Sequence, residues 1–169
     1  MILREKLHYK YPLPHVVDVL IEGFLNDPSS MMSQTPNVTE CELMRKVDKG
    51  DDVYATIRYS AYSQIPRVVQ HIIKPDMLTW ISSSHWDRKK LVYSFRTRTK
   101  YFSKQIYCGG KFTFHGNGNN ETVQNMEVDL RVKIPVFGII IEKEVARVYM
   151  KSLQESMGVV EKILREKML

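Results

Sequence analysis

The spacing of the apolar residues changes once near the end of the chain, and this change constrains the fold more than any other feature. From Val123 to Ile134, apolar and polar residues alternate, which is typical of a β-strand with one buried face. Pro135 and Gly138 then interrupt the strand. Over 139–168 apolar residues recur at steps of three and four without a further proline, which predicts a helix. A helix of about 30 residues would be about 45 Å long. We expect it to lie across a curved antiparallel sheet and to close a cavity.

The rest of the chain predicts six more strands and one or two short helices. The first strand spans 2–11 and leads through Pro12 and Pro14 into the helical segment. Three hairpins follow, with strands at 38–47 and 53–62, at 77–86 and 90–99, and at 106–115 and 123–134. Because the helices are segregated from an antiparallel sheet of about seven strands, the fold class is α+β.

Length and composition indicate one globular domain over residues 1–169. Hydrophobic residues make up 43% of the chain and charged residues 26%, which is an ordinary globular balance. No apolar run approaches the roughly 20 residues of a membrane span. The first residues carry charge early and lack an apolar signal core. We therefore expect a cytoplasmic protein that could also be peripheral to membranes, with Cys41 and Cys108 as reduced thiols.

The chain has a net charge of +6, and its basic residues gather at 88–90, at 96–104 and at 162–167. Solvated strand edges and a polar helix face would explain these groups. Attraction to anionic lipid surfaces would explain them as well. They do not alternate with aromatic residues on one platform, so no nucleic-acid partner is predicted.

A short amphipathic segment, Ile65 to Lys74, stands between two predicted strands where a few residues would suffice for a turn. Its apolar residues share one helical face. The segment either plugs the open end of the sheet or forms a lid or membrane-dipping loop over a cavity mouth. The residues expected to make the lid or membrane contact are Ile65, Val68, Val69, Ile72 and Ile73.

Three segments resemble the START-like superfamily, also called SRPBCC or helix-grip. Residues 9–17, Tyr-Lys-Tyr-Pro-Leu-Pro-His-Val-Val, resemble its opening, in which a strand leads through a proline into a helix. Residues 132–142 resemble a Val-Pro-Leu-(Val/Phe)-Gly-Gly-x-Ile-Glu stretch of an uncharacterised, mostly bacterial branch, with Ile139 replacing the second glycine. Residues 65–69 are similar to the lid loop of the PRELI-like phospholipid-transfer proteins.

This resemblance implies a helix-grip fold with a cavity between sheet and long helix. Members of the superfamily use that cavity for lipids, sterols and other apolar ligands, and a minority are enzymes such as cyclases. The fold alone does not choose between these functions.

Candidate ligand contacts are the residues expected to face the cavity from the strands and from the long helix. Ser82 and Ser84 interrupt an apolar face between Trp80 and Trp86, where they could offer hydroxyl contacts or could instead face solvent. The candidate ligand-binding residues are Leu7, Tyr59, Trp80, Ser82, Tyr93, Phe95, Phe112, Phe114, Met126, Val128, Leu130, Tyr149, Leu153 and Met157.

Motifs for catalysis or metal binding are absent from the sequence. There is no phosphate loop, Cys-x-x-Cys, His-Glu-x-x-His or nucleophile elbow, and the histidines are scattered. No cofactor, metal site or catalytic residue is therefore predicted, and Gly109-Gly110 is expected to form a bulge. Glu5 shares the parity of Leu3 and Leu7, so it could be an inward acid–base group or could sit at a wet strand edge.

The function expected from the sequence is the binding, and possible transfer, of a lipid-like or other apolar small molecule between the sheet and the C-terminal helix. Transient contact with anionic membrane surfaces would accompany it. The first alternative is a cyclase- or hydrolase-like enzyme that uses Glu5 or a pocket tyrosine. The second is a non-catalytic interaction module with a closed core. The sequence makes no prediction about the ligand's identity or the oligomeric state.

Overall fold

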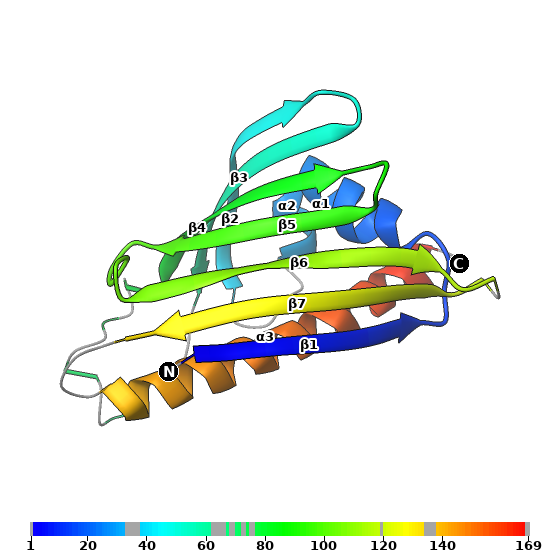
Figure 1. Cartoon of the computed structure of the whole chain (residues 1–169). Helices are drawn as coiled ribbons and strands as arrows, with labels where there is room; N and C mark the ends of the chain where they lie inside the picture. The colour runs from blue at the N-terminus through cyan, green and yellow to red at the C-terminus, as the bar shows by residue number, and fades with distance from the viewer. Residues whose placement is uncertain are drawn as a thin grey trace.

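A seven-stranded antiparallel sheet and a long C-terminal helix dominate the computed structural model (Figure 1). The structure describes residues 2–32, 38–61, 67, 70–71, 74, 77–118, 120–133 and 138–167. The strands are β1 (Ile2–Tyr11), β2 (Val38–Asp48), β3 (Asp52–Ala61), β4 (Thr79–Asp87), β5 (Val92–Thr99), β6 (Ile106–Gly116) and β7 (Thr122–Val132). The helical segments are η1 (Asp18–Gly23), α1 (Phe24–Asn26), α2 (Pro28–Met32) and α3 (Gly138–Lys167).

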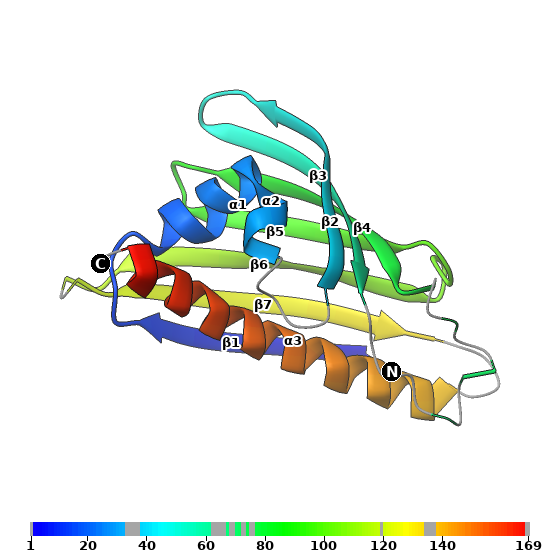
Figure 2. The same cartoon turned by 180° about the vertical axis from the view of Figure 1, so that it is seen from behind.

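The sheet follows the order β1-β7-β6-β5-β4-β3-β2, so the first strand pairs with the last. The three hairpins expected from the turn sequences are confirmed as β2–β3, β4–β5 and β6–β7. Side chains alternate between an inner and an outer face of the sheet, as the apolar and polar periodicity predicts. Both α3 and the short helical segments lie on the inner face (Figure 2). The predicted helix-grip α+β architecture is thus confirmed.

Helix α3 covers only one side of the inner face, where it packs against β7 and η1 (Figure 2). Near its C-terminus, Val160 and Leu164 pack with Tyr11 in one buried cluster. Near its N-terminus, Ala146 packs with Leu130 of β7 in another. The helix is therefore anchored at two separate places, and the inner faces of β3, β4 and β5 extend beyond it.

The helical segment after β1 closes one end of the inner face. Ile21, Phe24 and Leu25 join a buried cluster with residues of β3 to β6. The structure differs from the prediction in the type of helix, because η1 is a π-helix. Its Phe24 N–H is directed to the carbonyl of Val19, five residues earlier. A wider turn of this kind leaves the apolar spacing nearly unchanged, so the sequence pattern did not indicate it.

The prediction of a bulge at Gly109-Gly110 is wrong. Both glycines keep the pairing register, with Gly110 opposite Val128 on one side and Phe95 on the other. A Cβ at position 110 would overlap the carbonyl oxygen of Glu127, so the close approach of the two strands requires glycine there. The register shifts lie in β2 instead, at the free edge of the sheet.

Within the described residues, no helix combines the length and the apolar character needed to cross a membrane. The thiols of Cys41 and Cys108 are unpaired, in line with the sequence prediction.

Candidate ligand-binding cleft

The strand register arranges the inward side chains in rows that run across the sheet. The middle row is Glu5, Val128, Gly110, Phe95, Ser84 and Ala55. The row toward the helical segment η1 is Leu7, Met126, Phe112, Tyr93, Trp86 and Val53. The row on the other side is Leu3, Leu130, Cys108, Thr97, Ser82 and Ile57. We call the space between these rows and α3 the inner cleft.

Three aromatic rings meet near the centre of the inner face. The ring centroids of Phe95 and Phe112 are 5.3 Å apart, and those of Tyr93 and Phe112 are 5.8 Å apart. The Phe95 ring comes within 3.2 Å of the position that a Cβ would take at Gly110. The missing side chain at Gly110 therefore makes room for Phe95, and the three rings form an apolar platform.

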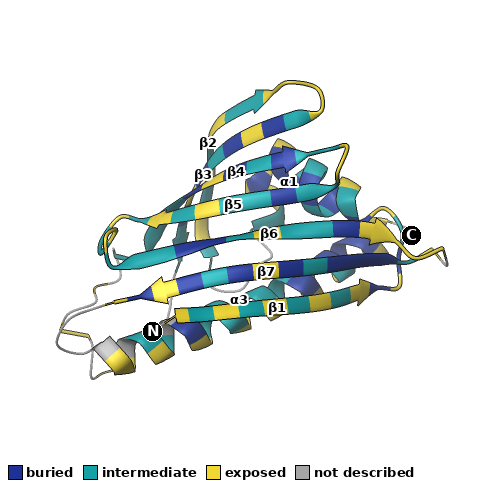
Figure 3. Ribbon diagram, in the orientation of Figure 1, coloured by how far each residue is buried: buried dark blue, intermediate teal, exposed yellow. Residues whose placement is uncertain are grey.

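Several inward side chains remain accessible to water although they point away from the outer face. Leu7, Phe95 and Phe112 are only half-buried, and so are Tyr149 and Leu153 on the facing helix. Figure 3 shows half-buried stretches along β1, β5, β6 and α3. Side chains in a tightly packed core would be almost completely buried. Part of the surface of these inward side chains is thus left uncovered by the described residues.

The predicted contact residues all lie on inward positions of the strands or on the apolar face of α3, but they differ in burial. Phe114 packs edge-on against Trp86 in the end cluster, and Leu130 packs beside Val132 and Ala146, so both belong to closed parts of the core. Buried residues of the set are Tyr59, Ser82, Tyr93, Phe114, Met126, Val128, Leu130 and Met157. Half-buried ones are Leu7, Trp80, Phe95, Phe112, Tyr149 and Leu153. Their role as ligand contacts stays a prediction.

Hydroxyl groups line the inner face of β4 and β5 on the side away from η1. Ser82 is 7% exposed and faces inward, so the alternative of a solvent-facing serine is wrong. Thr97 pairs with Ser82, and Thr99 pairs with Trp80. Sequence reasoning missed both threonines, although they share the parity of Phe95 and that parity would have indicated them.

Burial suppresses ionisation on the inner face. It raises the pKa of Tyr93 to about 12, and the Ser84 hydroxyl beside it opposes this shift. Burial is also the main cause that holds the pKa of Tyr59 well above its ordinary value. The pKa of the Cys41 thiol and that of the Cys108 thiol are both raised to about 11, again mainly by burial. These groups are neutral near pH 7, so they are poor nucleophiles and weak bases.

Glu5 points inward from β1 and is half-buried between Leu3 and Leu7. It makes no hydrogen bond or ion pair with the described residues. The neighbouring Tyr9 hydroxyl donates instead to Glu161 of α3, with the oxygens 2.9 Å apart. His8 points outward, with its Nδ1 2.7 Å from Asn125 Oδ1. The acid–base pair that an enzymatic role of Glu5 requires is therefore not formed among these residues.

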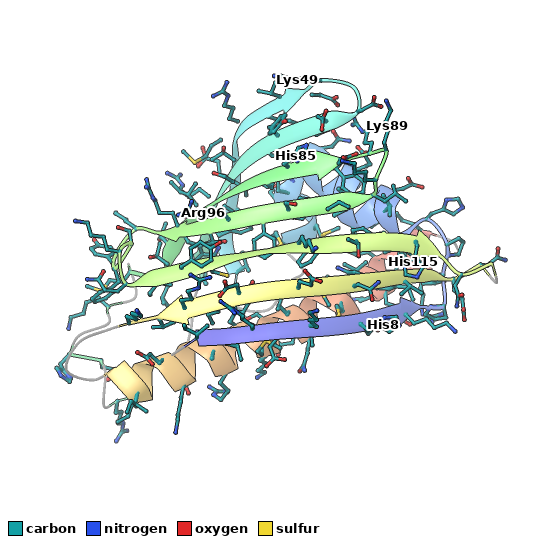
Figure 4. The ribbon with its side chains drawn as sticks, in the orientation of Figure 1. His8, Lys49, His85, Lys89, Arg96 and His115 are labelled. Carbon is teal, nitrogen blue, oxygen red and sulfur yellow. The ribbon has the colours of Figure 1, made fainter. Side chains whose placement is uncertain are left out.

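Histidines and basic residues of the outer face are spread over separate strands and turns (Figure 4). His8 lies on β1, His85 on β4 and His115 on β6. In the part of the chain that the structure describes, no three potential ligands among His, Cys, Asp and Glu gather to hold a metal ion.

Two hollows stand out on the surface of the described residues, and neither lies in the inner cleft. One, of about 350 Å³, follows the outer side of α3 around Gly158 and Lys162. The other, of about 760 Å³, lies mainly on the outer face of the sheet, where Gly109 has no side chain between Tyr107 and Lys111. Both are open at the surface, and charged residues make up most of their lining, unlike the usual site for a small apolar ligand.

The predicted lid residues Ile65, Val68, Val69, Ile72 and Ile73 lie outside the described residues, so the lid stays a prediction. The polar members of the same segment that are described, Arg67, Gln70, His71 and Lys74, are exposed.

A curved seven-stranded sheet gripping a long C-terminal helix places the chain in the helix-grip class of folds. Within that class, residues 8–164 match the family described as "Protein of unknown function (DUF2505)", and the chain belongs to this family. No curated protein matches the sequence. The likeness to the mostly bacterial branch and to the PRELI-like proteins stays a prediction.

Solved structures share the fold at low sequence identity. The Zhui aromatase/cyclase from Streptomyces sp. R1128 is 12% identical, with a TM-score of 0.73 over 100% of this chain and 97% of that chain. The protein TTHA0849 from Thermus thermophilus is 14% identical, with a TM-score of 0.70 over 98% and 99%. Norcoclaurine synthase from Thalictrum flavum is 10% identical, with a TM-score of 0.65 over 98% and 88%. At these identities the similarity shows the fold alone.

Proposed function

We propose that the protein binds an apolar or amphipathic small molecule in the inner cleft. The observation that carries this proposal is the half-burial of Phe95 and Phe112, two inward aromatic side chains on adjacent central strands. Covering their remaining apolar surface would contribute roughly 25 cal/mol per Å². Tyr149 of α3 belongs to the same cluster as Phe95, and Leu153, one turn further along the helix, is also half-buried. A ligand between the sheet and the helix would remove these side chains from water.

Chemistry around the cleft favours binding over catalysis. No described residue that points inward from β3, β4, β5 or β6 is charged, and burial keeps the tyrosines and thiols there neutral. Glu5 lacks a hydrogen-bonded partner among the described residues. The likeness in fold to a norcoclaurine synthase structure in complex with dopamine and hydroxybenzaldehyde supports small organic ligands for this fold. An enzyme of the cyclase or hydrolase kind stays the alternative.

The test is a binding titration with the neutral fluorescent probe N-phenyl-1-naphthylamine, combined with native mass spectrometry of the purified protein. We expect saturable binding by the wild type. Leu153→Arg would place a charge in the cleft and weaken binding at least tenfold, whereas Gln154→Arg, at the exposed neighbouring position, would leave it unchanged. No saturable binding by the wild type would contradict the proposal, and so would equal binding by both variants.

We further propose reversible docking on anionic membranes, by which a lipid-like ligand could be collected or delivered. This rests on the exposed basic residues at the end of the sheet away from η1. Ala61 is hydrogen-bonded to Leu78, and Lys100 to Thr79, so the β3–β4 connection and the end of β5 lie together. The exposed basic residues on these segments are Arg67, Lys74, Arg98, Lys100 and Lys104. Surface cations of this kind add about 1 kcal/mol each near an anionic membrane.

Liposome co-sedimentation tests the docking proposal. Arg98→Glu with Lys104→Glu should reduce binding to phosphatidylserine vesicles at low salt. Lys49→Glu with Lys89→Glu makes the same charge change near the opposite end of the sheet and should have little effect (Figure 4). Val69→Asp with Ile72→Asp tests whether the 65–74 segment inserts. Binding that does not depend on phosphatidylserine, on salt or on these variants would exclude the membrane contact and leave ligand binding untouched.

A further inference from the structure

Four inward hydroxyl groups gather on adjacent strands at the end of the inner cleft away from η1. They belong to Tyr59 of β3, Ser82 of β4, and Thr97 and Thr99 of β5. Ser82 is directly opposite Thr97, and Trp80 is directly opposite both Tyr59 and Thr99. Residues paired in this way have their Cβ atoms about 5 Å apart. We call this group the hydroxyl cluster.

Three of these hydroxyls make no hydrogen bond with the described residues, and one of the three is fully buried. Tyr59 is 9% exposed and Ser82 is 7% exposed as whole residues, and their hydroxyl oxygens make no hydrogen bond with the described residues, although they are not fully closed off from solvent. The Thr99 hydroxyl is fully buried and unpartnered as well. Elsewhere on the inner face such groups are paired: the Tyr11 hydroxyl donates to Gln124, and the Thr122 hydroxyl donates to the Leu13 carbonyl.

Unpaired buried hydroxyls are unusual and costly. The great majority of buried polar groups in folded proteins have a partner, and an unsatisfied one costs about 1–3 kcal/mol. Hydroxyls that face one cleft without a partner among the described residues are suited to bind a polar group of a ligand. The Tyr59 ring is also held in place, since it stacks on Trp80 with the centroids 5.6 Å apart and an interplanar angle of 15°. Its hydroxyl is therefore presented by a fixed ring.

The partner's charge follows from the surroundings. The hydroxyls can donate and accept, but none of the described inward residues of β3 to β6 carries a charge. A carboxylate or ammonium group placed here would lose its hydration without gaining an opposite charge, which is strongly unfavourable. A neutral hydroxyl or carbonyl group has no such penalty and can exchange hydrogen bonds with the cluster.

We propose that the ligand of the inner cleft carries a neutral hydroxyl or carbonyl group, which binds to Tyr59 and Ser82, on an apolar body that lies against Phe95 and Phe112. This inference rests on the proposed ligand-binding function and adds the chemical class of the ligand. The hydroxyl cluster selects neutral oxygen-bearing ligands over charged amphipaths and over plain hydrocarbons.

The test compares three probes with the same ring system: 2-naphthol, naphthalene and 2-naphthoate. Each competes with N-phenyl-1-naphthylamine for the wild-type protein near pH 7. We expect 2-naphthol to bind at least tenfold more tightly than either of the others. In Tyr59→Phe and in Ser82→Ala, the affinity for 2-naphthol should fall toward the affinity for naphthalene. The affinity for naphthalene itself should not change. Using two conservative variants guards against one of them failing to fold.

Matched controls come from outward hydroxyls of the same strands. Tyr54→Phe on β3 and Ser83→Ala on β4 remove exposed groups and should leave all three affinities unchanged. Equal binding of 2-naphthol and naphthalene, a preference for 2-naphthoate, or insensitivity to Tyr59→Phe and Ser82→Ala would overturn the inference while ligand binding stands. Failure of the wild type to bind N-phenyl-1-naphthylamine would overturn both this inference and the proposed ligand-binding function.

Discussion

The indole nitrogen of Trp86 donates a hydrogen bond to the carboxylate of Glu22, with the two atoms 2.8 Å apart. The Arg88 guanidinium donates to both oxygens of the same carboxylate, at 2.7 and 2.9 Å, and also binds Asp48. These contacts join η1 to the β4–β5 turn and to the end of β2. They fix the helical segment over the end of the inner cleft opposite the hydroxyl cluster.

This ion cluster predicts a loss of stability in acid. The hydrogen bonds from Arg88 are the main cause that lowers the pKa of Glu22 below its ordinary 4.5 and the pKa of Asp48 from 3.8 to about 2. A carboxyl group whose pKa is lower in the folded protein than in the unfolded chain stabilises the fold at a pH above its unfolded-state pKa. That stabilisation is lost as the pH falls through the folded-state pKa. The free energy of unfolding should therefore fall between about pH 4.5 and pH 2. Urea titrations across this range should show a weaker decline for Arg88→Gln than for the wild type.

Lys104→Gln is the matched control, because it removes one positive charge at an exposed position away from the cluster. It should keep the wild-type pH profile. If Arg88→Gln and Lys104→Gln give the same slope between pH 4.5 and pH 2, the cluster does not set the acid sensitivity.

Gly110→Ala should destabilise the sheet. The added methyl group would overlap the carbonyl oxygen of Glu127, which belongs to the paired backbone and cannot move freely. Overpacking of this kind costs about 1–3 kcal/mol. Thermal denaturation should show a clear drop for Gly110→Ala. Gly116→Ala, with open space around the new methyl, should be nearly neutral. Equal melting temperatures for the two variants would contradict the close approach of β6 and β7.

Both thiols should react slowly with iodoacetamide in the native protein. Burial raises the pKa of each to about 11, so at pH 8 the thiolate fraction is on the order of 100-fold lower than for an ordinary cysteine. Cys108 is 5% exposed and should react only when the sheet opens, whereas the half-buried Cys41 should react first. Mass spectrometry of Cys41→Ser and Cys108→Ser resolves the two sites. Fast labelling of Cys108 at pH 8 would contradict its burial.

Much of the fold could be predicted from the sequence because it follows from local periodicity. The alternation before Pro135 and the helical spacing after it located β7 and α3, and the turn sequences located the hairpins. The π-helix and the regular pairing at Gly110 could not be predicted in this way. Each depends on contacts between residues that the local pattern does not relate, such as Gly110 and Glu127.

The candidate site could be predicted in part. Strand parity correctly turned Phe95 and Phe112 inward, but it left open whether Ser82 faces the cleft or solvent. Parity could not show which inward residues stay accessible, because that depends on α3 crossing β7 rather than the centre of the sheet. Parity correctly turns Phe114 inward, but only the structure shows that it packs against Trp86 at the closed end, so its role as a ligand contact stays a prediction.

The most direct test of ligand binding in the inner cleft uses the two tryptophans of the chain. Trp80 is half-buried at the end of the cleft away from η1, and Trp86 is 1% exposed at the end that η1 closes. Trp86→Phe leaves Trp80 as the only tryptophan, and Trp80→Phe leaves Trp86. Both variants are first checked for a cooperative thermal transition. They are then titrated with 11-bromo-1-undecanol, whose bromine quenches tryptophan emission at contact. Ligand binding in the inner cleft predicts saturable quenching of Trp80 emission, with Trp86 emission unchanged. Equal quenching of both tryptophans, or none of Trp80, would contradict it.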